Sequence, residues 1–264
     1  MHPRLWSTPY FTLHTFGVFF ALAMLGALWW LVRGAKRTDI RPDLLMSLGI
    51  WAIVGGVVGA KLLFVLRSLP EFRAQPSQLW SLSFIETAGD FYGGFLGALT
   101  ACVIYFWLHP ELPAWPAADL CAPAIALGQG IGRIGCFFAG DDYGRPSNVR
   151  WAVTLTDPDA ARVGGAPLGV PLHPVQLYES LVCFALFIFL WWLSKRQQFD
   201  GEIILTYAAL YAVARFVLEY FRGDVDRGFV FGGALSTSQF IAIPVLAVSI
   251  VLLFIRLRRK KKTI

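Results

Sequence analysis

The sequence predicts an all-α polytopic membrane protein with about seven transmembrane helices and a small extracytoplasmic head that contains some strand. Composition is the first reason: 56% of the 264 residues are hydrophobic, 15% are charged, and the mean hydropathy is +0.59. A soluble domain needs more polar residues than this to cover its core. Apolar windows of membrane-spanning length and the distribution of Lys and Arg are the second and third reasons.

The apolar windows set the number of spans. A transmembrane helix needs roughly 20 mostly apolar residues, and the windows that meet this requirement are about 11–32, 44–66, 91–108, 120–139, 177–194, 203–221 and 239–255. No motif recurs at a fixed period, which argues against a transporter built from two related halves. We therefore expect residues 1–264 to form a single integral membrane domain.

The basic residues predict the orientation, because cytoplasmic loops carry an excess of Lys and Arg. With seven spans and a cytoplasmic C-terminus, 12 of these residues fall on the cytoplasmic side and 8 on the opposite side. The excess comes mainly from residues 33–41 and 256–262, which adjoin span ends. We expect an extracytoplasmic N-terminus. The isoelectric point is near 9.3, and we expect the basic residues behind it to contact anionic lipid rather than nucleic acid.

One long polar segment interrupts the spans. Residues 140–176 contain five prolines and the alternating sequence WAVTLT at 151–156, which is typical of a strand. This segment is predicted to form a small head insertion on the extracytoplasmic side. Residues 67–90 form a second polar segment, predicted to be a loop with an aromatic part that lies on the membrane surface.

Charged residues inside the spans are the first candidates for function. An arginine at a helix centre costs about 2.5–3.5 kcal/mol on insertion scales, so it should face a partner or a substrate. Arg133 and Arg215 are two such residues. Tyr211, Arg215, Glu219 and Arg222 are three or four positions apart and share one helix face, and an internal Arg215–Glu219 pair would account for that arginine without a ligand. Arg133 has no acid one turn away in its own span, which favours an anionic ligand.

The spans also contain glycine-rich stretches and four cysteines. Gly93 and Gly94 follow Tyr92, and residues 128–135 are also rich in glycine; both stretches would permit close helix packing or close approach of the backbone to a ligand. The four cysteines show no C-x-x-C spacing, so we expect small apolar packing residues and neither a metal site nor disulfides.

Four motifs, in order, resemble one known family. They are FYGG at 91–94, GRIGCFFAGDDYGR at 132–145, HPVQLYES at 173–180 and YAVARFVLEYFR at 211–222. Together with their spacing and apolar context, these motifs resemble the phosphatidylglycerol:prolipoprotein diacylglyceryl transferases of bacterial inner membranes. The resemblance extends from end to end of the chain.

The resemblance implies an enzyme without a metal or other cofactor. Such an enzyme moves the diacylglyceryl group of phosphatidylglycerol onto the lipobox cysteine of a prolipoprotein signal peptide, forms a thioether and releases glycerol phosphate. It also implies a multi-pass protein of the inner membrane with a periplasmic N-terminus, a periplasmic head and a cytoplasmic C-terminus. No nucleic acid is expected as a partner.

The resemblance also assigns roles to residues. Arg133 matches the arginine that binds the lipid phosphate, and Arg215 matches a second essential arginine, one turn after Tyr211. Asp141 takes the place of a glutamate in the enterobacterial form. The expected catalytic residues are Arg133, Arg215, Tyr92, Tyr211 and His14, and the expected substrate-binding residues are Gly93, Gly94, Cys136, Asp141, Gly144, Arg145 and Glu219.

The chain departs from the best-studied form of the family at three positions. Tyr92 replaces a histidine, Cys136 replaces an asparagine, and Phe16 replaces a tyrosine in the sequence HTFG at 14–17. A thiol with a pKa near 8.5 must lose its proton before it attacks, and the departures leave Tyr92 and His14 as alternative bases.

Two other functions remain alternatives. A relative that binds lipid or lipoprotein without turnover would also carry these motifs, and an anion transporter would also place arginines within the bundle. Neither would consume phosphatidylglycerol.

Overall fold

The computed structural model describes residues 3–8, 12–81, 84, 89–224 and 228–263. In this part of the chain, seven helices are long and apolar enough to cross a membrane. They are α1 (Thr15–Ala35), α2 (Pro42–Arg67), α5 (Phe91–Leu108), α6 (Ala114–Ala139), α8 (Val175–Ser194), α9 (Glu202–Leu218) and α10 (Thr237–Thr263). Each of the seven predicted windows overlaps one of them, so the predicted all-α polytopic fold is confirmed.

The chain forms two compact units. The first comprises residues 1–30 and 118–264, and the second comprises residues 31–117. The division passes through α1 and α6. The single domain expected from the sequence stays a prediction.

Glycines hold α2 and α5 together in the second unit. A Cβ atom at Gly97 would lie 2.2 Å from the carbonyl oxygen of Gly55, and one at Gly93 would lie 2.4 Å from that of Gly59. Any larger residue would therefore force the two backbones apart. The side chain of Asp90 accepts hydrogen bonds from the first amides of α5, as N-cap residues do. The predicted surface segment contains α3 (Leu69–Ala74) and the 3₁₀ turn η1 (Pro76–Trp80), while residues 82–83 and 85–88 lie outside the described residues.

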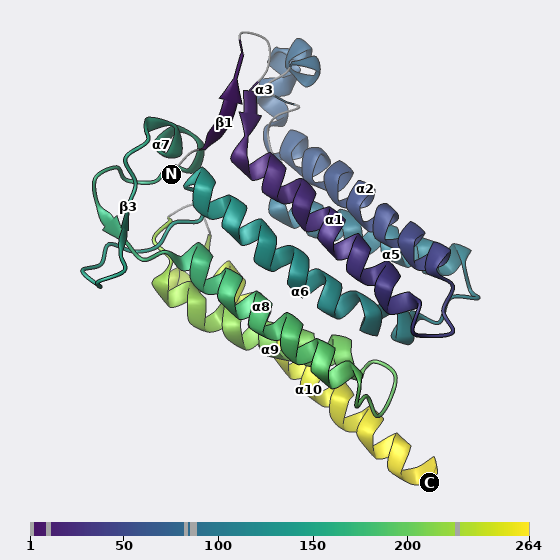
Figure 1. Ribbon diagram of the computed structural model, residues 1–264. Helices are drawn as coiled ribbons and strands as arrows, with labels where there is room; N and C mark the ends of the chain where they lie inside the picture. Colours follow the sequence, from purple (N-terminus) through teal and green to yellow (C-terminus); the bar gives the residue numbers. More distant parts are fainter. Residues whose placement is uncertain (1–2, 9–11, 82–83, 85–88, 225–227, 264) are drawn as a thin grey trace. The chain divides into compact units, whose positions relative to one another are not determined.

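Three neighbouring helices form much of the first unit. Helix α9 packs against both α8 and α10 (Figure 1). Small residues of α6 meet larger apolar residues of α8 and α9 in a buried core of Ala122, Ala126, Leu186, Leu190, Ile203 and Tyr207. Many apolar side chains on the opposite faces are exposed, including Val248 and Val251 of α10, as expected for helices surrounded by lipid.

The predicted head contains the strand character expected of it. Strands β3 (Val153–Thr154) and β4 (Pro171–Leu172) pair antiparallel, and the short helix α7 (Pro158–Gly164) lies between them in sequence. Leu155, Ala166 and Leu172 form a small core.

Two further hairpins belong to the first unit. Strands β1 (Arg4–Ser7) and β2 (Thr12–His14) pair antiparallel before α1. An ion pair of 2.7 Å between Arg4 and Asp159 joins this hairpin to the head. Strands β5 (Phe229–Val230) and β6 (Leu235–Ser236) flank the 3₁₀ turn η3 (Phe231–Gly233) and lead into α10.

Candidate active site

Arg133 lies near the end of α6 and meets acids from two other segments. Its Nε atom is 3.1 Å from Oε2 of Glu179 on α8, and its Nη1 atom donates to Asp142 in the loop after α6. The same Nη1 atom is 3.9 Å from the sulfur of Cys136, one turn later on the helix. The arginine that lacks an acid in its own span therefore has protein partners, which the sequence analysis did not identify.

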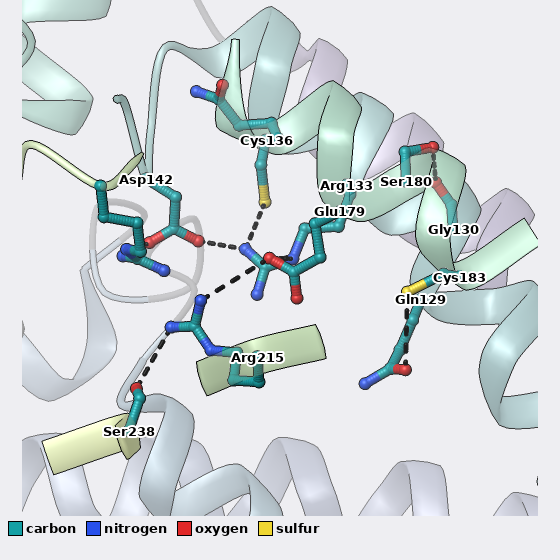
Figure 2. A network of polar contacts seen from close by, with 12 residues as sticks. Gln129, Gly130, Arg133, Cys136, Asp142, Glu179, Ser180, Cys183, Arg215 and Ser238 are labelled. Carbon is teal, nitrogen blue, oxygen red and sulfur yellow. Dashed lines mark hydrogen bonds and ion pairs between the residues drawn. The ribbon is translucent and has the colours of Figure 1, made fainter. Parts of the chain in front are cut away.

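Glu179 joins the two arginines predicted to be essential. Its side chain is 2% exposed, and Oε2 lies 3.8 Å from Nη1 of Arg215 as well as close to Arg133. Its other oxygen, Oε1, accepts a hydrogen bond of 2.7 Å from the hydroxyl of Tyr211. Figure 2 shows the guanidinium groups of Arg133, from α6, and Arg215, from α9, pointing toward this carboxylate.

Arg215 also contacts residues near the end of α9 and the start of α10. Its Nη2 atom is 3.1 Å from Glu219, which confirms that the two residues pair, and 3.2 Å from the hydroxyl of Ser238. Nη1 is buried and has no hydrogen-bond partner among the residues that the structure describes. A buried donor of this kind costs free energy unless a ligand satisfies it.

A third arginine completes what we call the arginine cluster, which contains Arg133, Arg215, Arg222, Asp142, Glu179, Glu219, Asp224 and Tyr211. Arg222, directly after the 3₁₀ turn η2 (Glu219–Phe221), donates to Asp142 and to both carboxylate oxygens of Asp224, at 2.9 and 2.7 Å. Asp142 is thus shared between Arg133 and Arg222. Although burial disfavours its charged form, these two guanidinium groups hold the pKa of the Asp142 carboxyl well below its usual range.

A polar chain runs from the arginine cluster into the helix bundle. The ring of Tyr207 stacks on that of Tyr211, with centroids 5.7 Å apart, and its hydroxyl donates to Gln129 at 2.5 Å. On the neighbouring face of α6, the hydroxyl of Ser180 donates to the carbonyl oxygen of Gly130 at 2.8 Å. These hydrogen bonds join α9 and α8 to α6 about one turn before Arg133.

The backbone of Gly144 and Arg145 connects the head to the end of α9. The amide of Arg145 donates to Phe221 at 2.8 Å, and its carbonyl oxygen accepts from His173 at 3.0 Å. A Cβ atom at Gly144 would lie 2.2 Å from the carbonyl oxygen of His173, so only glycine fits. The Nε atom of Arg145 donates to the carbonyl oxygen of Arg222 at 3.1 Å, which places Arg145 beside the arginine cluster.

The other predicted site residues occupy different surroundings. Asp141 directs its carboxylate to the amide of Asp142 at 2.8 Å, and its carbonyl oxygen accepts from Gln176 at 2.7 Å. His14 is the last residue of β2 and pairs with Arg4 in the N-terminal hairpin.

Tyr92, Gly93 and Gly94 begin α5 in the second unit. The backbone of α2 lies so close to Gly93 that no side chain fits there. Close helix packing, one of the two roles expected from the sequence, therefore explains this glycine. The part that these three residues take in a site with the arginines stays a prediction.

Comparisons with known proteins identify a family that matches almost the whole chain. The family model described as prolipoprotein diacylglyceryl transferase matches residues 3–255. The chain belongs to the prolipoprotein diacylglyceryl transferase family. Among curated relatives named phosphatidylglycerol–prolipoprotein diacylglyceryl transferase, one from Clostridium tetani is 33% identical over 92% of this chain and 93% of its own length. A relative from Acinetobacter baumannii is 31% identical over 94% of this chain and 89% of its own length.

Four charged residues of the arginine cluster were missed as site residues by the sequence analysis. They are Asp142, Glu179, Arg222 and Asp224, and each contacts at least one other charged member of the arginine cluster. A usable signal existed for Glu179, because it is an acid within the second turn of an otherwise apolar span. The rule that intramembrane charges face a partner applies to acids as well as to arginines.

Proposed function

We propose that this chain transfers the diacylglyceryl group of phosphatidylglycerol to the lipobox cysteine of prolipoproteins, with Arg133 and Arg215 binding the lipid phosphate. The observation that carries the proposal is that one oxygen atom, Oε2 of Glu179, lies near both Nε of Arg133 and Nη1 of Arg215. Two guanidinium groups that reach one carboxylate oxygen are also close enough to share the oxygens of one phosphate. Arginine binds phosphate oxygens through parallel N–H bonds and stays charged when desolvated.

The reaction increases negative charge at the phosphate. The cysteine sulfur bonds to the terminal carbon of the diacylglyceryl group, the bond from that carbon to the phosphate oxygen breaks, and glycerol phosphate leaves with the bonding electrons. The thiol proton passes to a base. Because the phosphodiester carries one negative charge and the released monoester gains a second, fixed cations stabilise the transition state more than the bound substrate.

The remaining roles follow the family resemblance. We place Tyr92 or His14 at the deprotonation of the thiol, and Gly93, Gly94, Cys136, Asp141, Gly144, Arg145 and Glu219 along the bound substrates. An unmodified phenol is a weak base at neutral pH, so Tyr92 would need help from its surroundings. The hydroxyl of Tyr211 already donates to Glu179, which favours an indirect role for this tyrosine.

We also place the chain in the bacterial inner membrane with its N-terminus and head in the periplasm. Arg33, Lys36 and Arg37 follow or end α1, and the basic run 256–262 ends α10, so the excess of positive charge supports a cytoplasmic position for these ends. Phosphatidylglycerol and lipobox signal peptides would reach the arginine cluster from the membrane.

Rescue of a bacterial strain depleted of its own transferase tests the proposal in cells. Purified protein, phosphatidylglycerol micelles and a lipobox peptide test it directly, through thioether formation and release of glycerol phosphate. Lipid that binds without thioether formation would favour the non-catalytic alternative. Anion flux into liposomes with no consumption of phosphatidylglycerol would favour a transporter.

A further inference from the structure

We propose that Glu179 is a positioning residue that aims the guanidinium groups of Arg133 and Arg215 at the lipid phosphate. This inference rests on the proposed transfer reaction and adds to it a residue from a third helix. Neither arginine can orient the other, because both carry positive charge. A carboxylate between them removes the repulsion and fixes the angle at which each approaches a ligand.

Glu179 contacts Arg133 without using the terminal nitrogens of that arginine. Glu179 meets Arg133 through Nε at 3.1 Å, on the inner edge of the guanidinium group. The ion pair with Glu179 uses neither terminal nitrogen, and one of them, Nη1, donates to Asp142. An arginine held at Nε keeps its planar guanidinium group oriented, so a phosphate can bind at both terminal nitrogens once it replaces Asp142 at Nη1.

The contact with Arg215 is looser. Nη1 of this arginine lies 3.8 Å from Oε2 of Glu179, beyond hydrogen-bonding distance, and it is a buried donor without a hydrogen-bond partner among the described residues. Glu179 therefore attracts Arg215 without using this donor, which leaves it for a phosphate oxygen.

Tyr211 holds the carboxylate in turn. Its hydroxyl donates to Oε1 at 2.7 Å and leaves Oε2 for the arginines, and its ring is fixed by the stack on Tyr207. Glu179 is 2% exposed, and Tyr211 is one turn before Arg215 on α9. We therefore assign to Tyr211 an effect on the reaction that is transmitted through Glu179.

The first variant is Glu179→Gln, which keeps the size of the side chain and removes its charge. We expect the kcat for thioether formation to fall about 10²-fold, as on removal of one fixed donor from a transition-state site. We expect KM for phosphatidylglycerol to change little, because the arginines remain and still attract the substrate anion. Asp224→Asn is the matched control, since it removes one negative charge from the arginine cluster at a residue that pairs with Arg222. It should lower kcat far less.

The second variant, Tyr211→Phe, removes only the hydroxyl and keeps the ring and its stack. A lower kcat with unchanged KM is expected, and the double variant should be no slower than Glu179→Gln alone. Tyr211→Phe also tests the inference if Glu179→Gln does not accumulate in the membrane. An unchanged kcat in Tyr211→Phe would overturn the positioning role of Glu179.

The positioning role would also be refuted by wild-type kcat in Glu179→Gln, by equal losses in Glu179→Gln and Asp224→Asn, or by additive losses in the double variant. Equal losses would mean that the arginine cluster needs only its total charge. The wild-type protein and Arg133→Lys are assayed in parallel. An inactive wild-type protein would contradict the proposed function itself, whereas an active wild type with an unaffected Glu179→Gln would contradict only this inference.

Discussion

The carboxylate of Asp119, on α6, caps the start of α9 at Gly201. Its Oδ2 atom accepts from the amide of Gly201 at 2.6 Å, and its Oδ1 atom accepts from the amides of Ile203 and Ile204, both at 2.9 Å. The first amides of a helix have no partner within the helix, and here a residue from another helix supplies one. Helices α6 and α9, which carry Arg133 and Arg215, are thus tied at the end opposite the arginine cluster.

Replacement of Asp119 should therefore destabilise the protein. Asp119→Ala leaves buried amides of α9 without an acceptor and should lower the free energy of unfolding by about 2 kcal/mol, the upper part of the range for a lost helix cap. Thermal unfolding in detergent micelles measures the change. Asp119→Asn keeps one oxygen acceptor and should lose less. Equal stability of Asp119→Ala and wild type would show that these hydrogen bonds contribute nothing net.

The ion pairs of Asp142 should make stability depend on pH. Arg133 and Arg222 depress the pKa of this carboxyl in the folded protein, so its contribution is fully present above the unfolded pKa of about 4. The contribution decreases as pH falls below that value and is lost at the folded pKa. Asp142→Asn should cost about 1–3 kcal/mol at neutral pH, and the difference from wild type should shrink in acid. A difference that stays constant below about pH 4 would contradict this account.

Lysine should not replace Arg133. Arg133→Lys keeps the charge but loses the planar fork and the Nε contact with Glu179, so transfer should be nearly abolished while the protein still inserts and accumulates. Arg150→Lys, at an exposed position of the head, is the control and should retain activity. If lysine supports transfer as well as arginine does, a positive charge at this position is sufficient for the reaction. The proposed bidentate contact between Arg133 and the lipid phosphate would then be wrong.

Substitution of Tyr92 tests whether the chain is an enzyme with altered base chemistry or an inactive relative. If its hydroxyl takes part in proton transfer, Tyr92→Phe should lower turnover by roughly 10²–10⁴-fold, with far less effect on lipid binding. Tyr92→His should keep substantial activity. Thioether formation on a lipobox peptide, from about pH 6 to about pH 10, gives the profile of each variant. Full activity of Tyr92→Phe would transfer the role of base to His14 or to water.

Labelling of introduced cysteines should report the orientation of the chain. A cysteine at Ser147, in the head, should react with an impermeant reagent from outside the inner membrane, and one at Thr263 should be protected. The label on permeabilised cells is the control for reactivity. The reverse pattern would place the head in the cytoplasm and overturn the predicted topology.

Local patterns predicted the helices and the pairing within one helix, but not the contacts between helices. Hydropathy located all seven long helices, and helical spacing located the Arg215–Glu219 pair. The start of α6 at Ala114 lies several residues before the predicted window, because Trp115, Pro116 and Asp119 reduce the hydropathy there without ending the helix.

The partners of Arg133 could not be read from periodicity. Glu179 is on a different helix, and Asp142 reaches the arginine from a loop in which its backbone has a positive φ of 55°. Both contacts depend on how α6, α8 and the loop after α6 pack together. Sequence spacing within one span carries no information about that packing.

The shared carboxylate of Glu179 also constrains the order of events during synthesis. Helix α6 leaves the ribosome before α8, so Arg133 enters the translocation machinery before its Glu179 partner exists. Insertion of an unpaired arginine is unfavourable by about 2.5–3.5 kcal/mol at a helix centre and by less near a helix end, where Arg133 lies. The Gly-rich α6 should therefore settle stably in the bilayer only after α8 has been made, and ribosome-bound chains that end before Glu179 should carry a loosely inserted α6.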